Sequence, residues 1–340
     1  TERHLTERHQ QAPSLLVDKD ARALSVKLTS RKKKAESAKA LIELLDKRLD
    51  GPFDFEQASS WYHSLATWKR RRGLQSSHWD SPVVARLHAR VQQIVLEDQL
   101  NEQAFANIFW SIAKVSDRFS IPTELVDALV KSLPAKAKGM KQQELSKCLW
   151  ACAQLKDLVP VLQAVPAIVS QIPSKAKGMT PQHLSNCLWA TVQLKKVVPD
   201  VLEIVPAITV QIPDKAKGMK PQELSSCLWA CAQLKDDAPE VLEIVLPVVK
   251  QVRMKIKDMN AQDLSTNLEA LVPLQKLVPE IARLVADSNG REDILRSSAA
   301  RLSTLLPRLR GKDLSIAVPS VIRACAKLGR VAALRGPQTV

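Results

Sequence analysis

One phrase recurs along this chain: KGMKQQELSKCLWACAQLKD at 138–157, KGMTPQHLSNCLWATVQLKK at 177–196 and KGMKPQELSSCLWACAQLKD at 217–236. Two weaker copies flank these three, LNEQAFANIFWSIAKVSD at 100–117 and KDMNAQDLSTNLEALVPLQK at 257–276. Self-similarity at a spacing of about 39–40 residues is typical of solenoids, in which each unit buries its apolar surface against its neighbours. Extended stacked surfaces of this kind usually bind other macromolecules, so the pattern favours a binding function over catalysis.

Each unit reads as a helical hairpin. On a helical wheel, Leu145, Cys148 and Leu149 gather on one side of the first segment, and Gln143 and Lys147 lie opposite them. The second segment is strongly apolar, begins at a proline and carries another proline near its middle, which predicts a kinked helix or two short ones. The expected fold class is therefore all-α, an α-solenoid of stacked helical hairpins with a period of about 39–40 residues.

The pattern divides the chain into four regions. They are a polar, basic N-terminal extension at 1–34, an N-terminal helical region with a candidate degenerate repeat at 35–99, the solenoid core at 100–286 and degenerate capping repeats at 287–340. Within the second region, residues 35–51 predict an amphipathic helix, and residues 53–68 resemble a degenerate first helix of another repeat unit. The chain begins at Thr1 rather than Met, which fits a removed targeting peptide, although a boundary of another origin stays open.

The charge balance favours a polyanionic partner. Lys and Arg number 50 against 35 Asp and Glu, which gives a formal net charge of +15. Phosphates attract such a surface and release counterions on binding, so we expect RNA as the partner, together with other proteins of a ribonucleoprotein assembly. No apolar run has the length of a membrane span, so we expect no membrane partner.

The cysteines predict neither disulfides nor a metal site. Cys148, Cys187 and Cys227 fall at one repeat position, and equivalent positions on packed helices lie about 8–10 Å apart, too far for a disulfide. We expect these thiols to be small core residues in a reducing compartment. There is no CxxC pair, no metal spacing among the histidines, no Gly-rich phosphate loop and no nucleophile motif. We therefore expect no catalytic residue, metal or cofactor, and no enzyme.

Paired lysines recur in the basic loop of each unit. Stacking would turn them into a row along one edge, suited to a phosphate backbone; a solvated edge that only maintains solubility is the alternative. The candidate phosphate contacts are Lys136, Lys138, Lys175, Lys177, Lys215, Lys217, Lys255 and Lys257. Two charge runs outside the core are further candidates, with Lys32, Lys33 and Lys34 in the first and Arg70, Arg71 and Arg72 in the second.

The polar face of the first helix is the candidate base-reading surface. A glutamine is constant there, and a polar residue that varies between units follows four residues later. Recognition of one base by each unit would need this pattern; an ordinary exposed helix face, the alternative, shows it too. The candidate base contacts are Gln103, Asn107, Gln143, Lys147, Gln182, Asn186, Gln222 and Ser226.

Four tryptophans, Trp110, Trp150, Trp189 and Trp229, also share one repeat position. On the wheel they lie between the polar face and the apolar side, which favours contact with the next repeat. Stacking on bases is the alternative for these rings.

Leu-Trp-Ala followed by a proline-led second helix, in units of 38–40 residues, resembles the octotricopeptide repeat of organelle RNA-binding proteins. The resemblance covers 138–250 well and 100–137 and 250–286 in part; Ser111 and Glu269 depart from the pattern. It implies RNA binding in an organelle, with a mitochondrion favoured over a plastid. Family members act in transcript stability, processing or translation, and some are ribosomal components that hold ribosomal RNA.

The expected function is thus non-catalytic binding and stabilisation of ribosomal RNA as a component of an organellar ribosome. A transcript-specific stability, processing or translation factor is one alternative. A scaffold that holds another protein is the alternative from a different class.

Overall fold

The computed structural model describes Ala35 and residues 37–71, 73–285, 293–311, 315 and 318–334. Every regular element in these ranges is a helix, and they contain no strand, which confirms the all-α helical-repeat class. Two compact units lie within Thr1–Ser132 and Leu133–Val340. Their boundary falls inside α7 (Thr123–Ala137), whereas the repeat pattern alone placed the start of the solenoid core at residue 100.

The first unit contains α2 (Ala38–Leu49), α3 (Phe55–Arg71), α4 (Ser76–Trp79), α5 (Pro82–Leu96) and α6 (Glu102–Val115). Helix α3 packs along α6, and α2 packs on α5. Asp54 caps α3 through the backbone N–H of Gln57, as Asn101 caps α6 through that of Ala104. Counted from these caps, His63 corresponds to Trp110, and their rings stack with centroids 5.8 Å apart. The helix expected within 53–68 is thus present as α3, and its identity as a degenerate first helix stays a prediction.

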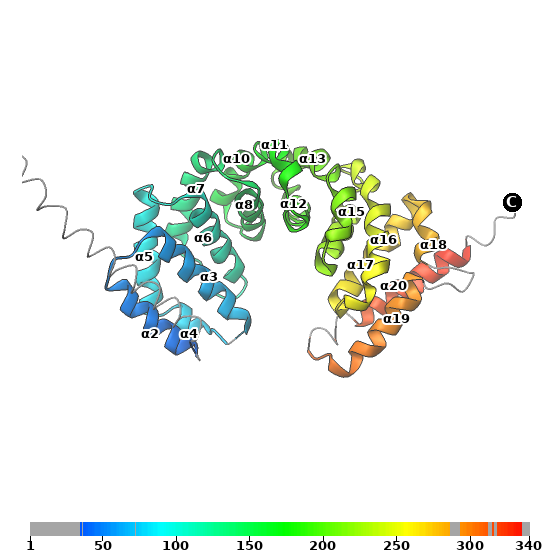
Figure 1. Cartoon of the computed structure of the whole chain (residues 1–340), viewed down its shortest axis with the longest axis horizontal. Coiled ribbons are helices and arrows are strands. Elements are labelled where there is room, and N and C mark those ends of the chain that lie inside the picture. Colours follow the sequence, from blue (N-terminus) through cyan, green and yellow to red (C-terminus); the bar gives the residue numbers. More distant parts are fainter. Residues whose placement is uncertain are drawn as a thin grey trace, which may run out of the picture. The chain divides into compact units, whose positions relative to one another are not determined.

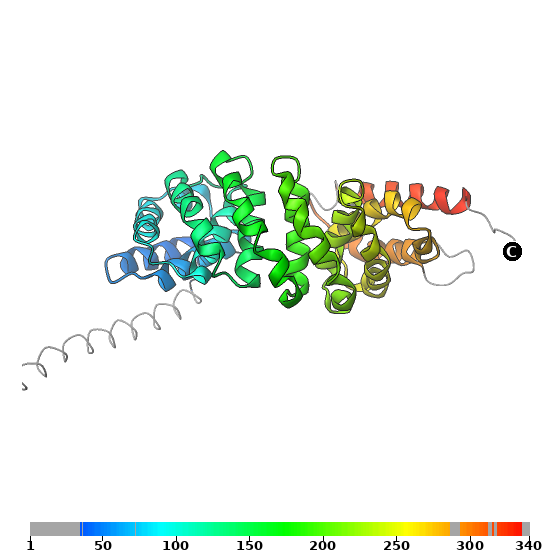
Figure 2. The same ribbon diagram turned by 90° about the horizontal axis from the view of Figure 1, so that it is seen from above.

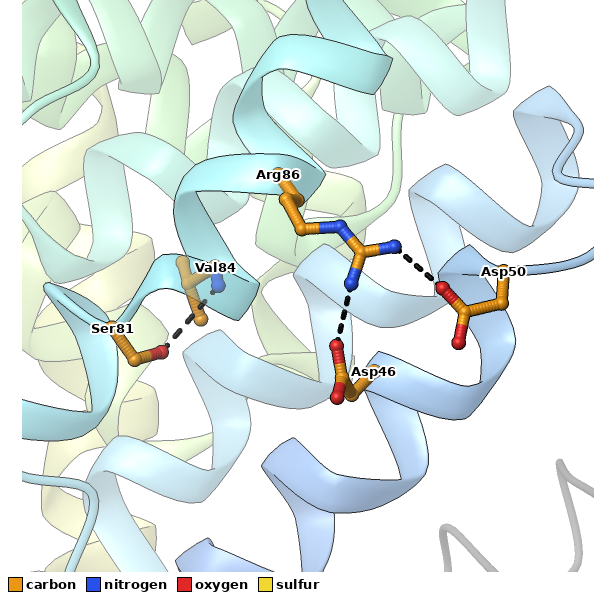
Figure 3. A network of polar contacts seen from close by, with 5 residues as sticks. All are labelled: Asp46, Asp50, Ser81, Val84 and Arg86. Carbon is orange, nitrogen blue, oxygen red and sulfur yellow. Dashed lines mark hydrogen bonds and ion pairs between the residues drawn. The ribbon is translucent and has the colours of Figure 1, made fainter.

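An ion-pair network joins α2 to α5 in this unit (Figure 3). The Arg86 guanidinium donates to Asp46 at 2.7 Å and to Asp50 at 2.6 Å. The hydroxyl of Ser81 accepts from the backbone N–H of Val84 and begins α5. These groups are exposed, so the network orients the two helices more than it stabilises them.

The second unit has two layers of helices (Figure 1). One layer consists of the first helices of successive hairpins, each packed on the next: α8 (Gln142–Gln154), α12 (Pro181–Leu194), α15 (Pro221–Leu234), α17 (Ala261–Leu277) and α20 (Val318–Leu334). The other layer holds the second segments, with α10, α13 and α16 against α8, α12 and α15. Figure 2 shows the hairpins of this unit following one another in chain order, from green to red.

The first helices begin at equivalent residues although their capping groups differ. Thr180 and Asn260 accept from the backbone N–H of the third helical residue. The Lys141 side chain cannot accept a hydrogen bond in this way. Instead, the Glu144 carboxylate accepts from the Lys141 backbone N–H at 2.8 Å, and the Glu223 carboxylate accepts from the Lys220 backbone N–H at 2.8 Å. The acidic half of a capping box is therefore sufficient to fix the start of these helices.

Prolines break the second segments into more pieces than the sequence predicted. Two repeats carry prolines seven residues apart, and both are divided: α9 (Val159–Gln163), α10 (Val165–Val169), α11 (Ile172–Lys175) and η1 (Ala176–Gly178), then η2 (Pro199–Ile204), α13 (Val205–Thr209), α14 (Ile212–Lys215) and η3 (Ala216–Gly218). Their prolines lie in the first two positions of the short helices, where no N–H is needed. In the next repeat Pro247 is the only proline after the initial Pro239, and α16 (Val245–Lys255) runs unbroken between η4 (Pro239–Ile244) and η5 (Ile256–Asp258).

The last described segments complete the second layer, with η6 (Pro279–Ile281), α18 (Ala282–Val285), α19 (Ile294–Leu305) and η7 (Leu306–Arg308). Helix α19 packs on α16 and α17. The expected N-terminal extension at 1–34 and part of the capping region at 287–340 lie outside the described residues.

Five of the six cysteines are core residues, as predicted: Cys148, Cys152, Cys187, Cys227 and Cys231 are free and fully buried, whereas the free Cys325 is half-buried. Burial raises the pKa of Cys187 and Cys227 to about 12, so these thiols stay protonated near neutral pH. In α17 the equivalent position is Asn267, whose Nδ2 donates to Ser225 while its buried Oδ1 has no hydrogen-bond partner.

Replacing Asn267 by the cysteine of the other units should therefore stabilise the protein. The Asn267→Cys variant removes an unsatisfied buried carbonyl, worth about 1 kcal/mol, which corresponds to a rise of roughly 2–4 °C in the thermal midpoint. Circular dichroism melting measures it. The reverse change, Cys227→Asn, should cost about 1–3 kcal/mol. An unchanged or lower midpoint for Asn267→Cys would contradict this account of the core.

Candidate nucleic-acid interface

Each basic loop of the second unit has one half-buried and one exposed lysine. The half-buried residues are Lys136, Lys175, Lys215 and Lys255, and the exposed ones are Lys138, Lys177, Lys217 and Lys257. A buried Ala137, Ala176, Ala216 or Ile256 separates the members of each pair and anchors the loop in the core. On the sequence alone, all eight lysines have the same predicted role. The structure divides them into a half-buried class and an exposed class.

Three half-buried lysines, Lys175, Lys215 and Lys255, bridge consecutive units, and we call them the bridging lysines. The ammonium of Lys215 donates to the carbonyl oxygens of Lys177 at 2.7 Å and Met179 at 2.6 Å. Lys175 makes the equivalent bonds to Lys138 at 3.3 Å and Met140 at 2.5 Å. Lys255 donates to Lys217 at 2.8 Å and to Met219. These carbonyls end the preceding helical segments, where a cation is favourable.

The same carbonyl position is held by another residue type in the following unit. Arg301 of α19 donates from Nε to the Met259 carbonyl at 2.9 Å. No loop lysine marks this unit in the sequence, so the bridge was not predictable there. Its recurrence with arginine indicates that the bond between units matters more than the side chain that makes it.

The bridges place the exposed lysines, defined as Lys138, Lys177, Lys217 and Lys257, in adjacent loops. Each bridging ammonium bonds the backbone of the exposed lysine one unit earlier or its near neighbour, so consecutive loops are in direct contact. The predicted row of loops along one edge is therefore present. Since each exposed lysine lies four residues before the start of a first helix, the row follows the N-terminal edge of that layer.

Gly178 ends η1 but does not adopt the left-handed conformation in which glycine often ends a helix. A Cβ at this residue would lie 2.5 Å from Nε2 of Gln142 in the preceding unit. The glycine thus allows close approach between loop and helix.

The candidate base contacts lie on one face of the first helices. Gln103, Gln143, Gln182 and Gln222 are exposed, while Asn107, Lys147, Asn186 and Ser226, one turn further on, are half-buried. Asn107 donates from Nδ2 to the Ser59 hydroxyl at 3.1 Å, so this residue also joins α6 to α3. In the second unit, burial lowers the pKa of His183; the nearby charges of Lys147 and Lys215 lower it further, and that of Glu144 raises it.

The tryptophans lie on this same face, because each follows its glutamine by seven residues, or about two helical turns. Trp110, Trp150, Trp189 and Trp229 are all partly exposed, whereas the leucines that directly precede three of them are fully buried. The rings of Trp150 and Trp189 meet across two units, with centroids 6.0 Å apart, as a contact between repeats requires. The wheel placed these residues at the border of the polar face but gave no measure of their exposure.

The remaining candidates lie partly outside the described residues. Lys32, Lys33, Lys34 and Arg72 are outside them, and the side chains of Arg70 and Arg71 at the end of α3 are not described. In the described ranges, no cluster of three or more His, Cys, Asp or Glu side chains is suited to a metal ion. None of the described helices is long and apolar enough to cross a bilayer.

In comparisons with known proteins, no family model matches this chain, and no curated protein is significantly similar to it. The resemblance to octotricopeptide repeats therefore rests on the residues quoted above.

Two lysines of one loop give a matched test of the bridge. Lys215→Met retains the apolar stem but removes two charge-assisted bonds, so it should destabilise the chain by about 1.5–3 kcal/mol. Lys217→Met, in the exposed position, should stay within about 0.5 kcal/mol of the wild type. Urea unfolding followed by circular dichroism measures both. Equal midpoints for the two variants would show that the bridge contributes nothing.

Proposed function

We propose that this chain is a non-catalytic RNA-binding helical-repeat protein and that the exposed lysines bind the phosphates. The main support for this proposal is the row that these lysines form along adjacent loops. Neighbouring loops are held together by the bridging lysines, so the row is a preformed edge and does not have to assemble on binding. Packed helices lie about 8–10 Å apart, a spacing that flexible lysine side chains can match to the phosphates of one strand.

Charge supports RNA over a neutral partner. The whole chain carries a net charge of +15, and the four exposed lysines are concentrated at the edge where the first helices direct their N-termini. Backbone contacts of this kind give affinity and position without sequence preference.

Within this proposal, the protein is a component of an organellar, mitochondrial ribosome that holds ribosomal RNA. The resemblance to octotricopeptide repeats supports the organelle and the RNA class. The small number of regular units supports a structural role on ribosomal RNA over the recognition of a unique transcript.

The salt dependence of RNA binding tests the role of the exposed lysines. Changing Lys138, Lys177, Lys217 and Lys257 together to Gln should lower the slope of log Kd against log salt by about 3, since each phosphate contact on a single strand contributes about 0.7. Fluorescence anisotropy with a labelled RNA oligonucleotide measures it. A control variant with the same loss of charge changes the exposed Lys196, Lys250, Lys276 and Lys327 to Gln.

The control should keep a slope close to that of the wild type. Equal slopes for the two fourfold variants would refute the proposed edge, because the charge would then act without regard to position. If the wild type binds no RNA but retains a protein partner from extract, the protein is a scaffold.

The ribosomal assignment has a separate test. Wild-type protein should remain with ribosomal particles from the organelle through a high-salt wash and sedimentation, because a resident component is held by many contacts in the assembled particle. Release into the free fraction together with messenger RNA would instead assign the protein to transcript maturation.

A further inference from the structure

The first helices α8, α12 and α15 present one continuous stripe of side chains, which we call the tryptophan face. Its positions are i, i+4, i+7 and i+11, which share one side of a helix. The residues are Gln143, Lys147, Trp150 and Gln154 on α8, Gln182, Asn186, Trp189 and Gln193 on α12, and Gln222, Ser226, Trp229 and Gln233 on α15. None of these positions is occupied by a carboxylate.

Contact between repeats does not account for the whole of this face. Trp150 and Trp189 do touch, but both rings and that of Trp229 remain partly open to solvent. The cores of the same helices are filled by completely buried leucine and cysteine side chains, so the tryptophans are not needed to fill the interior. A tryptophan that is only partly buried in three successive units, between amide side chains, is typical of a contact surface.

We propose that the tryptophan face stacks against unpaired bases, so that the RNA bound by this protein is single-stranded along α8, α12 and α15. The inference rests on the proposed RNA-binding function and adds to it the class of RNA and the residues that hold its bases. A strand whose phosphates follow the exposed lysines at the helix N-termini directs its bases along the helices. Each tryptophan lies seven residues beyond its glutamine, or about 10 Å along the axis.

Single strands fit this surface better than duplexes. In a duplex the faces of the bases are already stacked on one another, whereas unpaired bases stack readily on aromatic side chains. The side-chain amides of Gln143, Gln182 and Gln222 can both donate hydrogen bonds to acceptors and accept them from donors on the edges of unpaired bases. A face of tryptophan and glutamine bordered by lysine therefore combines stacking, polar contact and phosphate attraction.

The face ends at α17. Glu269 occupies the position of the tryptophan there and is exposed. It has no ring on which a base can stack, and its carboxylate repels a phosphate backbone. The stacked bases therefore belong to the three units with Trp150, Trp189 and Trp229.

A comparison of two ligands tests the inference without any mutation. One is an oligouridylate, and the other is an abasic chain of the same length, which keeps the sugar and phosphate groups but has no bases. Wild-type protein should bind the oligouridylate at least about 5-fold more tightly, since stacking contributes about 1–3 kcal/mol per base. The oligouridylate, but not the abasic chain, should quench tryptophan fluorescence.

Variants then assign the preference to this face. Trp189→Leu should lose about 5-fold or more in affinity for the oligouridylate and nothing for the abasic chain or for duplex RNA of equal length. Trp189→Phe keeps an apolar ring between the units and should lose less. A matched control is Trp61→Phe, in the buried core of the first unit, which should leave all three affinities unchanged. Circular dichroism confirms that each variant is folded.

The outcomes separate this inference from the proposed function. Equal affinity of wild type for the oligouridylate and the abasic chain, with both weakened by loss of the exposed lysines, overturns the stacking but keeps RNA binding. No binding of either ligand overturns both. If both Trp189 variants keep the preference for bases and lose a protein partner instead, the face is a protein-docking surface and the inference fails.

Discussion

The bond from a bridging lysine to the carbonyl end of the preceding unit is the interaction on which the second unit depends. A solenoid has no central core, so each junction must be fixed by contacts between neighbours. Lys175, Lys215 and Lys255 bond loop to loop at three successive junctions, and Arg301 replaces them at the next. A buried carbonyl that lacks a partner is costly, so these bonds also fix the register of the stack.

The same short loop segment therefore serves structure and binding at once. In the three Lys-x-Lys triplets that begin with a bridging lysine, the first lysine bonds to the previous unit, the middle residue enters the core and the second lysine faces solvent. The bridging lysine therefore fixes the position of the exposed lysine two residues after it. Loss of RNA binding after a substitution in this segment has two distinct causes, and only a measurement of stability distinguishes them.

Much of this fold could be predicted from the sequence, because its signals are periodic. The wheel pattern of Leu145, Cys148 and Leu149 predicted the first helices and their buried side, and the mid-segment prolines predicted interruptions. The division of the lysines and the exposure of the tryptophans could not be predicted. Each depends on how close the neighbouring unit lies: Lys215 is half-buried because it reaches the Met179 carbonyl of the preceding unit.

The most direct measurement of the central claim is to photo-cross-link the protein to RNA and to identify the attached peptides by mass spectrometry. Contact along the loops and first helices predicts cross-links within 138–157, 177–196 and 217–236, with few in the second layer. Cross-links concentrated on α10, α13 and α16, or none above the level of an unrelated basic protein, would contradict the account.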